Sequence, residues 1–205
     1  MIAIIDYGVG NLFSLLSSLQ AIGQEAVVTS DMDVIKAADR IILPGVGAFA
    51  DAIAKLRSTG LDKVVISEAE SGKPIMGICL GMQLLFEKSY EYGEHTGLGL
   101  IKGSIIPIKD RVKSGLKIPH IGWNAIYHNK NHELLKFTPS GEFVYFVHSY
   151  FADECDESLL TYTEYGEKIT ASVVFKNVYG VQFHPEKSGN VGLNILRAFC
   201  EWEGV

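Results

Sequence analysis

The stretch from Pro74 to Phe86 constrains the fold more than any other part of the chain. It consists of Pro-Ile-Met-Gly-Ile-Cys-Leu-Gly-Met-Gln-Leu-Leu-Phe, so an apolar run ends in a turn flanked by Gly77 and Gly81, and an apolar helical pattern follows. This order is typical of a nucleophile elbow, in which a reactive side chain stands at the apex of a tight turn between a strand and a helix. The apex residue is Cys79, whose sulfur we expect at the helix start, where free N–H groups favour a thiolate. A buried structural cysteine is the alternative interpretation.

Strands and helices alternate up to and through this elbow, which predicts a parallel α/β sheet. Apolar runs indicate strands at residues 2–5, 26–29 and 41–43, and helical spacing indicates helices at about 12–22, 49–57 and 61–70. Ligands in such sheets bind beyond the carboxyl ends of the strands. The loop Pro44–Gly47 follows the third strand and would lie at the same end as Cys79. Its backbone N–H groups suit an anion or a developing oxyanion, with a plain tight turn as the alternative.

The second half of the chain has a different pattern. Residues 98–128 and 142–183 contain strand-like runs with few helical signals, and a last helix is expected to begin near Ser188. We therefore predict an α/β fold in a single domain, 1–205. Its central, mostly parallel sheet carries helices on both faces, with a smaller antiparallel sheet in the C-terminal half.

Composition narrows the class of protein. The chain has 205 residues, 47% of them hydrophobic and 20% charged, as in an ordinary globular protein. A net charge of -6 argues against a nucleic-acid footprint, and no apolar run is long enough to predict a membrane span. Cys79, Cys155 and Cys200 are far apart, which disfavours a disulfide framework or a zinc knuckle. We expect a cytoplasmic protein.

A cysteine nucleophile needs a base and a group that orients the base. Among six histidines, His184 lies just past a predicted strand, with Glu186 two positions later. In extended backbone such positions face the same side, so Glu186 can hold the imidazole while His184 accepts the thiol proton. A strand-end histidine beside a surface glutamate is the alternative. His128 and His132 are four apart, but the Asn-Lys-Asn between them indicates a turn rather than a zinc pair.

Several motifs together resemble a known family. The segments Gly77-Ile-Cys-Leu-Gly-Met-Gln83, Gln182-Phe-His-Pro-Glu186 and Pro44-Gly-Val-Gly47 resemble class I (triad) glutamine amidotransferases. Three further segments narrow the resemblance to the glutaminase subunit of imidazole glycerol phosphate synthase, in histidine biosynthesis: Asp6-Tyr-Gly-Val-Gly-Asn-Leu12, Pro119-His-Ile-Gly-Trp-Asn124 and Tyr145-Phe-Val-His-Ser-Tyr150. The resemblance covers essentially the whole chain and implies a flavodoxin-like amidotransferase fold.

The resemblance also implies roles. The triad would be Cys79 as nucleophile, His184 as base and Glu186 as its orienting partner. The oxyanion would be held by backbone N–H groups of Val46 or Gly47 and of Leu80. The glutamine substrate would be held by Gln83, Glu91, His148, Ser149 and Tyr150. Two residues depart from the pattern, because Tyr90 stands where relatives often carry an acid and Phe13 replaces a polar or basic residue.

A partner is implied as well, because ammonia released into water would be diluted and protonated. The resemblance implies a heterodimer with a (β/α)₈ cyclase subunit that uses the ammonia to make imidazole glycerol phosphate and aminoimidazole-carboxamide ribotide, and it implies no cofactor and no metal. Contact residues would be Asn11, the His120–Asn124 segment with His120, Trp123 and Asn124, and Lys187. The alternatives are a glutaminase serving a different synthase, a γ-glutamyl hydrolase, or a non-catalytic α/β binding module. Stimulation by a cyclase and labelling of Cys79 by glutamine analogues distinguish them.

Overall fold

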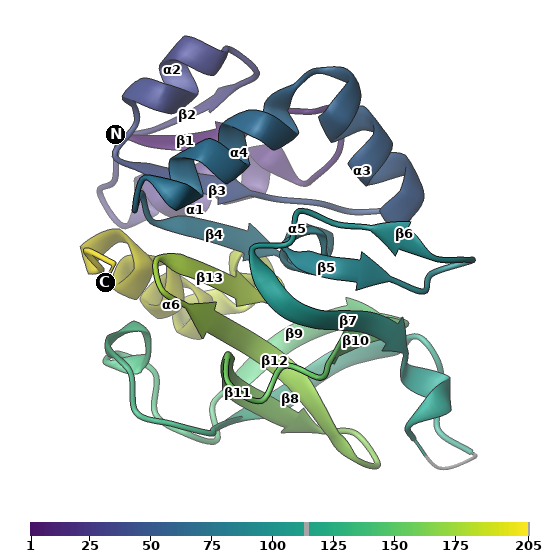
Figure 1. Ribbon diagram of the computed structural model, residues 1–205. Helices are drawn as coiled ribbons and strands as arrows, with labels where there is room; N and C mark the ends of the chain where they lie inside the picture. The colour runs from purple at the N-terminus through teal and green to yellow at the C-terminus, as the bar shows by residue number, and fades with distance from the viewer. Residues whose placement is uncertain (113–114, 205) are drawn as a thin grey trace.

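The computed structural model describes residues 1–112 and 115–204, which form two sheets and their covering helices (Figure 1). The large sheet has nine strands, in the spatial order β2 (Ala26–Thr29), β1 (Ile2–Ile5), β3 (Arg40–Leu43), β4 (Ile75–Ile78), β13 (Val178–Val181), β12 (Lys168–Phe175), β11 (Leu159–Glu164), β8 (His120–His128) and β9 (Phe143–His148). The first five strands in this order, which end with β13, run parallel to one another. Each of the remaining four strands runs antiparallel to the strand before it. The predicted α/β fold is confirmed.

The arrangement of the antiparallel part differs from the expectation. Its strands β12, β11, β8 and β9 extend the main sheet rather than forming a separate one. The second sheet has the order β10 (Tyr150–Asp153), β7 (Ile101–Pro107), β5 (Phe86–Ser89) and β6 (His95–Thr96). It is mixed, because β5 and β7 run parallel. A run of strand-like segments does not reveal which neighbour each strand pairs with, since pairing is decided by contacts distant in sequence.

Helices cover both faces of the parallel half. Helices α1 (Leu12–Ala21) and α6 (Gly189–Glu201) lie on one face, and α2 (Met32–Ala37), α3 (Phe49–Ser58) and α4 (Leu61–Glu70) lie on the other (Figure 1). Strand β1 is apolar throughout for this reason: Ala3 and Ile5 join one core while Ile2 and Ile4 join the other. Three single turns of 3₁₀-helix are η1 (Ile108–Asp110), η2 (Glu133–Leu135) and η3 (Pro185–Lys187). In the described part of the chain, no helix is long and apolar enough to cross a membrane.

Two local elements differ from the sequence prediction. Helix α2 was not predicted, although Asp31 caps it by accepting hydrogen bonds from the N–H groups of Asp33 and Val34. Helix α5 (Leu80–Leu84) after the elbow has only five residues, and Phe86 already begins β5. An apolar run such as residues 84–86 suits a helix or a strand equally, and here packing against the second sheet decides.

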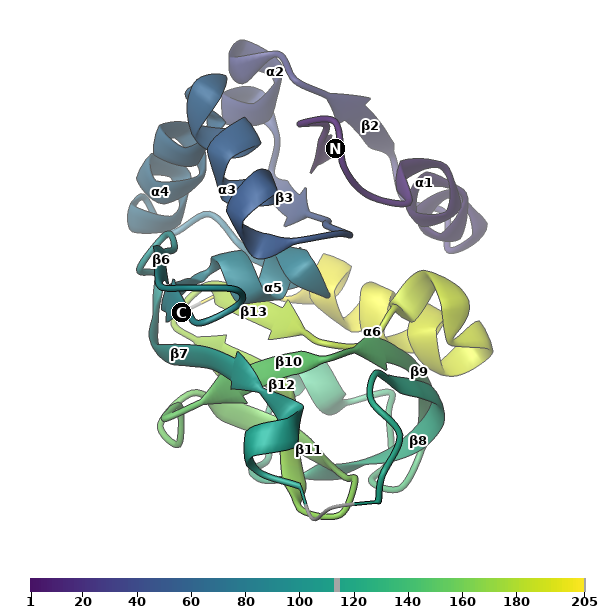
Figure 2. The ribbon, with the colours of Figure 1, turned by 90° about the vertical axis from the view of Figure 1, so that its right-hand side faces the viewer.

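Strand β13 holds the two halves of the sheet together. It pairs with β4 on one side, with Val181 opposite Ile78, and with β12 on the other. The N–H of Cys79 donates to the carbonyl of Val181 at 2.8 Å, so the chain after β13 leaves the sheet beside the elbow. Figure 1 shows β4 pointing to the right, and Figure 2 views the molecule from that side.

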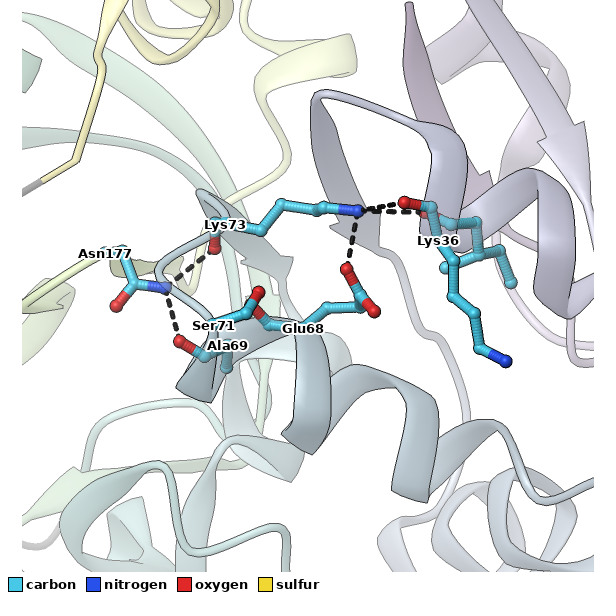
Figure 3. A network of polar contacts seen from close by, with 7 residues as sticks. Lys36, Glu68, Ala69, Ser71, Lys73 and Asn177 are labelled. Atoms are coloured by element: carbon cyan, nitrogen blue, oxygen red, sulfur yellow. Dashed lines mark hydrogen bonds and ion pairs between the residues drawn. The ribbon is translucent and has the colours of Figure 1, made fainter.

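The amino ends of β4 and β13 are joined by a polar network (Figure 3). The Asn177 amide, in the turn between β12 and β13, donates to the carbonyls of Ala69 and Lys73 at 2.8 and 2.7 Å. The Lys73 ammonium pairs with Glu68 at 2.6 Å and donates to the carbonyl of Lys36. This network fixes the start of the elbow strand relative to β13, the strand that precedes His184.

Candidate active site

The elbow around Cys79 has the geometry that its glycines predicted. Cys79 has φ 54° and ψ −113°, and helix α5 begins directly after it. A Cβ at Gly81 would lie 1.8 Å from the carbonyl oxygen of Leu43, and one at Gly77 would lie 2.7 Å from the backbone of Met82. Glycine is therefore required on both sides of the turn, because strand, turn and helix backbones are in contact there. Helix α5 has only five residues, so its dipole is small. The electrostatic environment of the thiol is therefore set mainly by neighbouring side chains.

His184 and Glu186 form the predicted contact, but by a different backbone route. Nδ1 of His184 lies 2.8 Å from Oε1 of Glu186, and both side chains are 3% exposed. The chain between them is the η3 turn rather than an extended strand, with Pro185 at its first position. The Ser188 hydroxyl donates to the His184 carbonyl at 2.7 Å and accepts from the N–H of Tyr145 at 3.0 Å. These bonds hold the turn against β9, and the contact of Nδ1 with Glu186 leaves Nε2 of His184 on the opposite side of the ring.

The electrostatics of His184 favour its charged form. Burial by itself lowers the pKa of this imidazole, but hydrogen bonding and charge from Cys79 and from Glu186 outweigh burial and raise the pKa above its ordinary 6.5. The Glu186 carboxylate and the nearby sulfur of Cys79 thus favour the imidazolium form of His184 at neutral pH. This arrangement can supply a thiolate and a proton at the same place.

The loop between β3 and α3 lies against the elbow. The Tyr7 hydroxyl donates to the carbonyl of Pro44 at 2.7 Å, and a Cβ at Gly45 would lie 2.8 Å from both that hydroxyl and the N–H nitrogen of Gly81. Gly47 has φ +99°, which favours glycine. At the far end of the loop, the carboxylate of Glu91 accepts the N–H of Phe49 at the start of α3. The loop is therefore fixed at both ends.

A cleft of about 500 Å³ opens over the elbow. It brings together Cys79 and His184 with every residue predicted for the oxyanion and the substrate: Val46, Gly47, Leu80, Gln83, Glu91, His148, Ser149 and Tyr150. Glu186 lies behind His184 and lines a separate small cavity with Asn11. The positions of these residues agree with the sequence prediction, whereas their roles remain predictions.

A buried hydrogen-bond network forms one wall of the cleft. The carbonyl of Tyr150 accepts Nδ1–H of His148 at 2.8 Å and Nε2–H of Gln83 at 3.2 Å. Burial lowers the pKa of His148 to about 3, so its ring is neutral and its Nε2 accepts a bond from Nδ1 of His120 at 3.0 Å. Gln83 also donates to Oε1 of Gln182 at 3.0 Å. Its amide nitrogen is thus used within the protein, which leaves its oxygen for a ligand.

Comparisons with known proteins agree with this site. The family described as glutamine amidotransferase class-I matches residues 3–201. The imidazole glycerol phosphate synthase subunit HisH of Aquifex aeolicus is 51% identical over 96% of this chain and 94% of its own length. The subunit of the same name from Wolinella succinogenes is 48% identical over 98% of this chain and 99% of its own. The chain belongs to the class-I glutamine amidotransferases, within the HisH subunit family.

Solved structures show the same fold at lower identity. A structure described as a glutamine amidotransferase superposes with a TM-score of 0.77 at 18% identity and covers 100% of both chains. PurLQS from Thermotoga maritima superposes with a TM-score of 0.73 at 22% identity over 97% of this chain and 96% of that chain. The amidotransferase fold is therefore shared across sequences that have diverged widely.

Some cleft residues of this amidotransferase were not predicted. Lys109, in the turn after β7, and the exposed Tyr92 both line the cleft. Gln182 lies beneath it, with Nε2 at 3.7 Å from Sγ of Cys79. Lys109 and Tyr92 lie in loops whose position depends on the second sheet, so the sequence carried no signal for them. Gln182 did have one, because a glutamine that ends an apolar strand needs buried hydrogen-bond partners.

The residues predicted for partner contact differ in exposure. Trp123 is 53% exposed and Lys187 is exposed, with its ammonium 5.7 Å from the centre of the Tyr145 ring. Asn11 and Asn124 are half-buried. His120 is only 1% exposed and stacks on Tyr165 with ring centres 4.1 Å apart. His120 therefore supports this surface from below, and any contact it has with a partner is indirect.

Proposed function

We propose that this chain hydrolyses L-glutamine to glutamate and ammonia through a thioester on Cys79. The thiolate attacks the side-chain amide carbon and forms a C–S bond, while the carbonyl electrons move onto oxygen. His184 gives its Nε2 proton to the amide nitrogen, the C–N bond breaks, and ammonia leaves. Water then attacks the thioester, His184 takes its proton, and the C–S bond breaks to give glutamate and the thiolate.

One observation carries this proposal: Cys79 lines the same cleft as His184, whose Nδ1 lies 2.8 Å from the Glu186 carboxylate. Val46, Gly47 and Leu80 line this cleft, and we infer that the backbone N–H groups of Val46 or Gly47 and of Leu80 hold the oxyanion. Losing one such donor costs about 10²–10³ in rate. Glu91 lines the cleft and carries a negative charge that suits the substrate ammonium. Ser149 and Tyr150, where β9 leads into β10, add polar groups to the same cleft.

We further propose that the ammonia passes to a partner, a (β/α)₈ cyclase subunit of imidazole glycerol phosphate synthase. The names of the relatives, which are subunits, support this. Exposed apolar side chains support it independently. Phe13 is 80% exposed and Ile121 58%, and Ile121 and Trp123 lie two apart on β8, facing the same side.

Free thiols at Cys155 and Cys200 support a reducing, cytoplasmic compartment.

The experiment is co-purification with a cyclase subunit, followed by glutamine turnover with and without the nucleotide substrate. We expect a stable complex and faster ammonia release when both are present. Cys79→Ala is expected to abolish ammonia release and leave the complex intact. If the cyclase neither binds nor stimulates, the partner proposal fails; if Cys79→Ala retains turnover, the thioester proposal fails.

A matched pair of variants tests the surface. Trp123→Ala is expected to weaken the complex by about 30-fold or more, as for a central aromatic contact worth about 2 kcal/mol. Phe175→Ala removes another exposed aromatic, at the end of β12 beside the Asn177 turn and far from the cleft. It is expected to leave affinity unchanged. If Trp123→Ala and Phe175→Ala change the affinity for the cyclase subunit equally, Trp123 is not part of the interface.

A further inference from the structure

Gln182 is a fully buried amide in contact with the candidate nucleophile. It directly follows β13, has 0% exposure, and its backbone N–H donates to Ala171 at 2.8 Å. Its side chain makes two contacts: Oε1 accepts from Nε2 of Gln83 at 3.0 Å, and Nε2 lies 3.7 Å from Sγ of Cys79. A buried amide is stable only when its polar atoms are paired, so the sulfur is one of the two partners that satisfy it.

The direction of this amide follows from the carbonyl of Tyr150. A backbone carbonyl only accepts, so the group of Gln83 that lies 3.2 Å from it is the NH₂. That same NH₂ meets Gln182 and requires an acceptor there, which assigns Oε1 of Gln182 to Gln83 and its NH₂ to the sulfur. The opposite orientation of Gln182 would oppose two NH₂ groups in a buried site. The network therefore presents an N–H donor, and not an oxygen, to Cys79.

We propose that Gln182 is a further catalytic residue of this amidotransferase, one that stabilises the Cys79 thiolate and fixes the position of its sulfur. The role rests on the proposed thioester function but concerns the resting enzyme, before glutamine binds. A hydrogen bond to the charged form of a group favours that form. The charged group beside the sulfur is the His184 imidazole, which shares the cleft with Cys79 and is held by Glu186. Gln182 adds an uncharged donor that stays constant across the working pH range.

The test is the pH dependence of Cys79 alkylation by iodoacetamide, with mass spectrometry to report modification of that residue, in the absence of glutamine. Gln182→Met removes the donor at similar length, and we expect the onset of alkylation to move up by about one pH unit, as expected for a hydrogen bond to a charged group. Gln182→Glu keeps an acceptor for Gln83 but places an oxygen against the sulfur, so it should move the onset further. Gln20→Met, an exposed position on α1, is the matched control and should not move it.

A second measurement needs no variant to fold. In the ¹⁵N-labelled wild-type protein, the side-chain NH₂ signal of Gln182 should shift with the same pH midpoint as alkylation, and it should shift again when Cys79 is alkylated. An unchanged onset in a folded Gln182→Met protein, or an NH₂ signal that ignores both events, overturns the proposal. The alkylation assay uses no glutamine, so it tests Gln182 separately from the proposed function. If alkylation behaves as expected but the protein does not turn over glutamine, the proposed function is rejected and the role of Gln182 is not.

Discussion

The backbone at Cys79 predicts an unusual order of stability between two simple variants. With φ 54° and ψ −113°, this residue lies outside the regions that side chains with a Cβ prefer, including the left-handed helical region. Such a conformation costs roughly 1–3 kcal/mol for a residue with a Cβ. Cys79→Gly relieves this strain, whereas Cys79→Ala keeps it. Glycine loses about 0.5–1 kcal/mol more than alanine through the entropy of the unfolded chain.

The difference between the middle values of these two ranges leaves the Cys79→Gly protein more stable than the Cys79→Ala protein by about 1 kcal/mol, the reverse of the usual order. The assay is urea unfolding followed by circular dichroism, supported by thermal scans in which 1 kcal/mol corresponds to about 2–4 °C for a chain of this size. Cys200 on helix α6 provides the control, because there the glycine variant should be the less stable of the pair. If Cys79→Gly is no more stable than Cys79→Ala, the elbow is not strained and this reasoning is wrong.

Other predictions concern the cleft. Glu186→Gln should reduce kcat at least ~10-fold less than His184→Ala, since an orienting group matters less than the base; equal losses in a glutamine assay would show that Glu186 does more than orient. His148, whose pKa burial lowers to about 3, is neutral when folded but takes up a proton below about 6.5 when unfolded. The free energy of unfolding should therefore fall as pH falls from about 6.5 toward 3. His148→Gln removes this proton uptake, so the slope of the unfolding free energy against pH, measured in urea, should become smaller by up to ~1.4 kcal/mol per pH unit. Equal slopes for the two proteins would contradict this. Lys109→Met should raise KM for glutamine up to about 5-fold with kcat unchanged, if the ammonium attracts the substrate carboxylate across solvent; an unchanged KM would remove Lys109 from the binding site.

The local sequence was sufficient to predict those elements whose structure depends on steric contacts between residues close together in the chain. The elbow followed from two glycines around Cys79, and the structure shows the collisions that exclude a Cβ at Gly77 and Gly81. Strand β1 and helices α3 and α4 likewise followed from apolar spacing within ten residues. The contact of His184 with Glu186 was also expected, but for the wrong reason, because Pro185 begins a helical turn that the strand pattern does not predict.

Long-range contacts were beyond such patterns. Nothing local indicates that Gln182 lies against Cys79, since the two are 103 positions apart in the chain. The split of the C-terminal strands between two sheets depends on the same kind of contact. His120 shows the limit of a motif, because its neighbour Trp123 is exposed while His120 itself is buried by stacking on Tyr165.

The central position of β13 has a consequence for the chain as it leaves the ribosome. Strand β4 is complete once residue 78 has been made, yet the strand that covers its free edge spans Val178–Val181. Until then the nascent protein presents an unpaired parallel edge, which is a template for aggregation. The same delay keeps Cys79 apart from His184 and Gln182, which follow β13 in the chain, so the cleft over the elbow cannot form until they have been made.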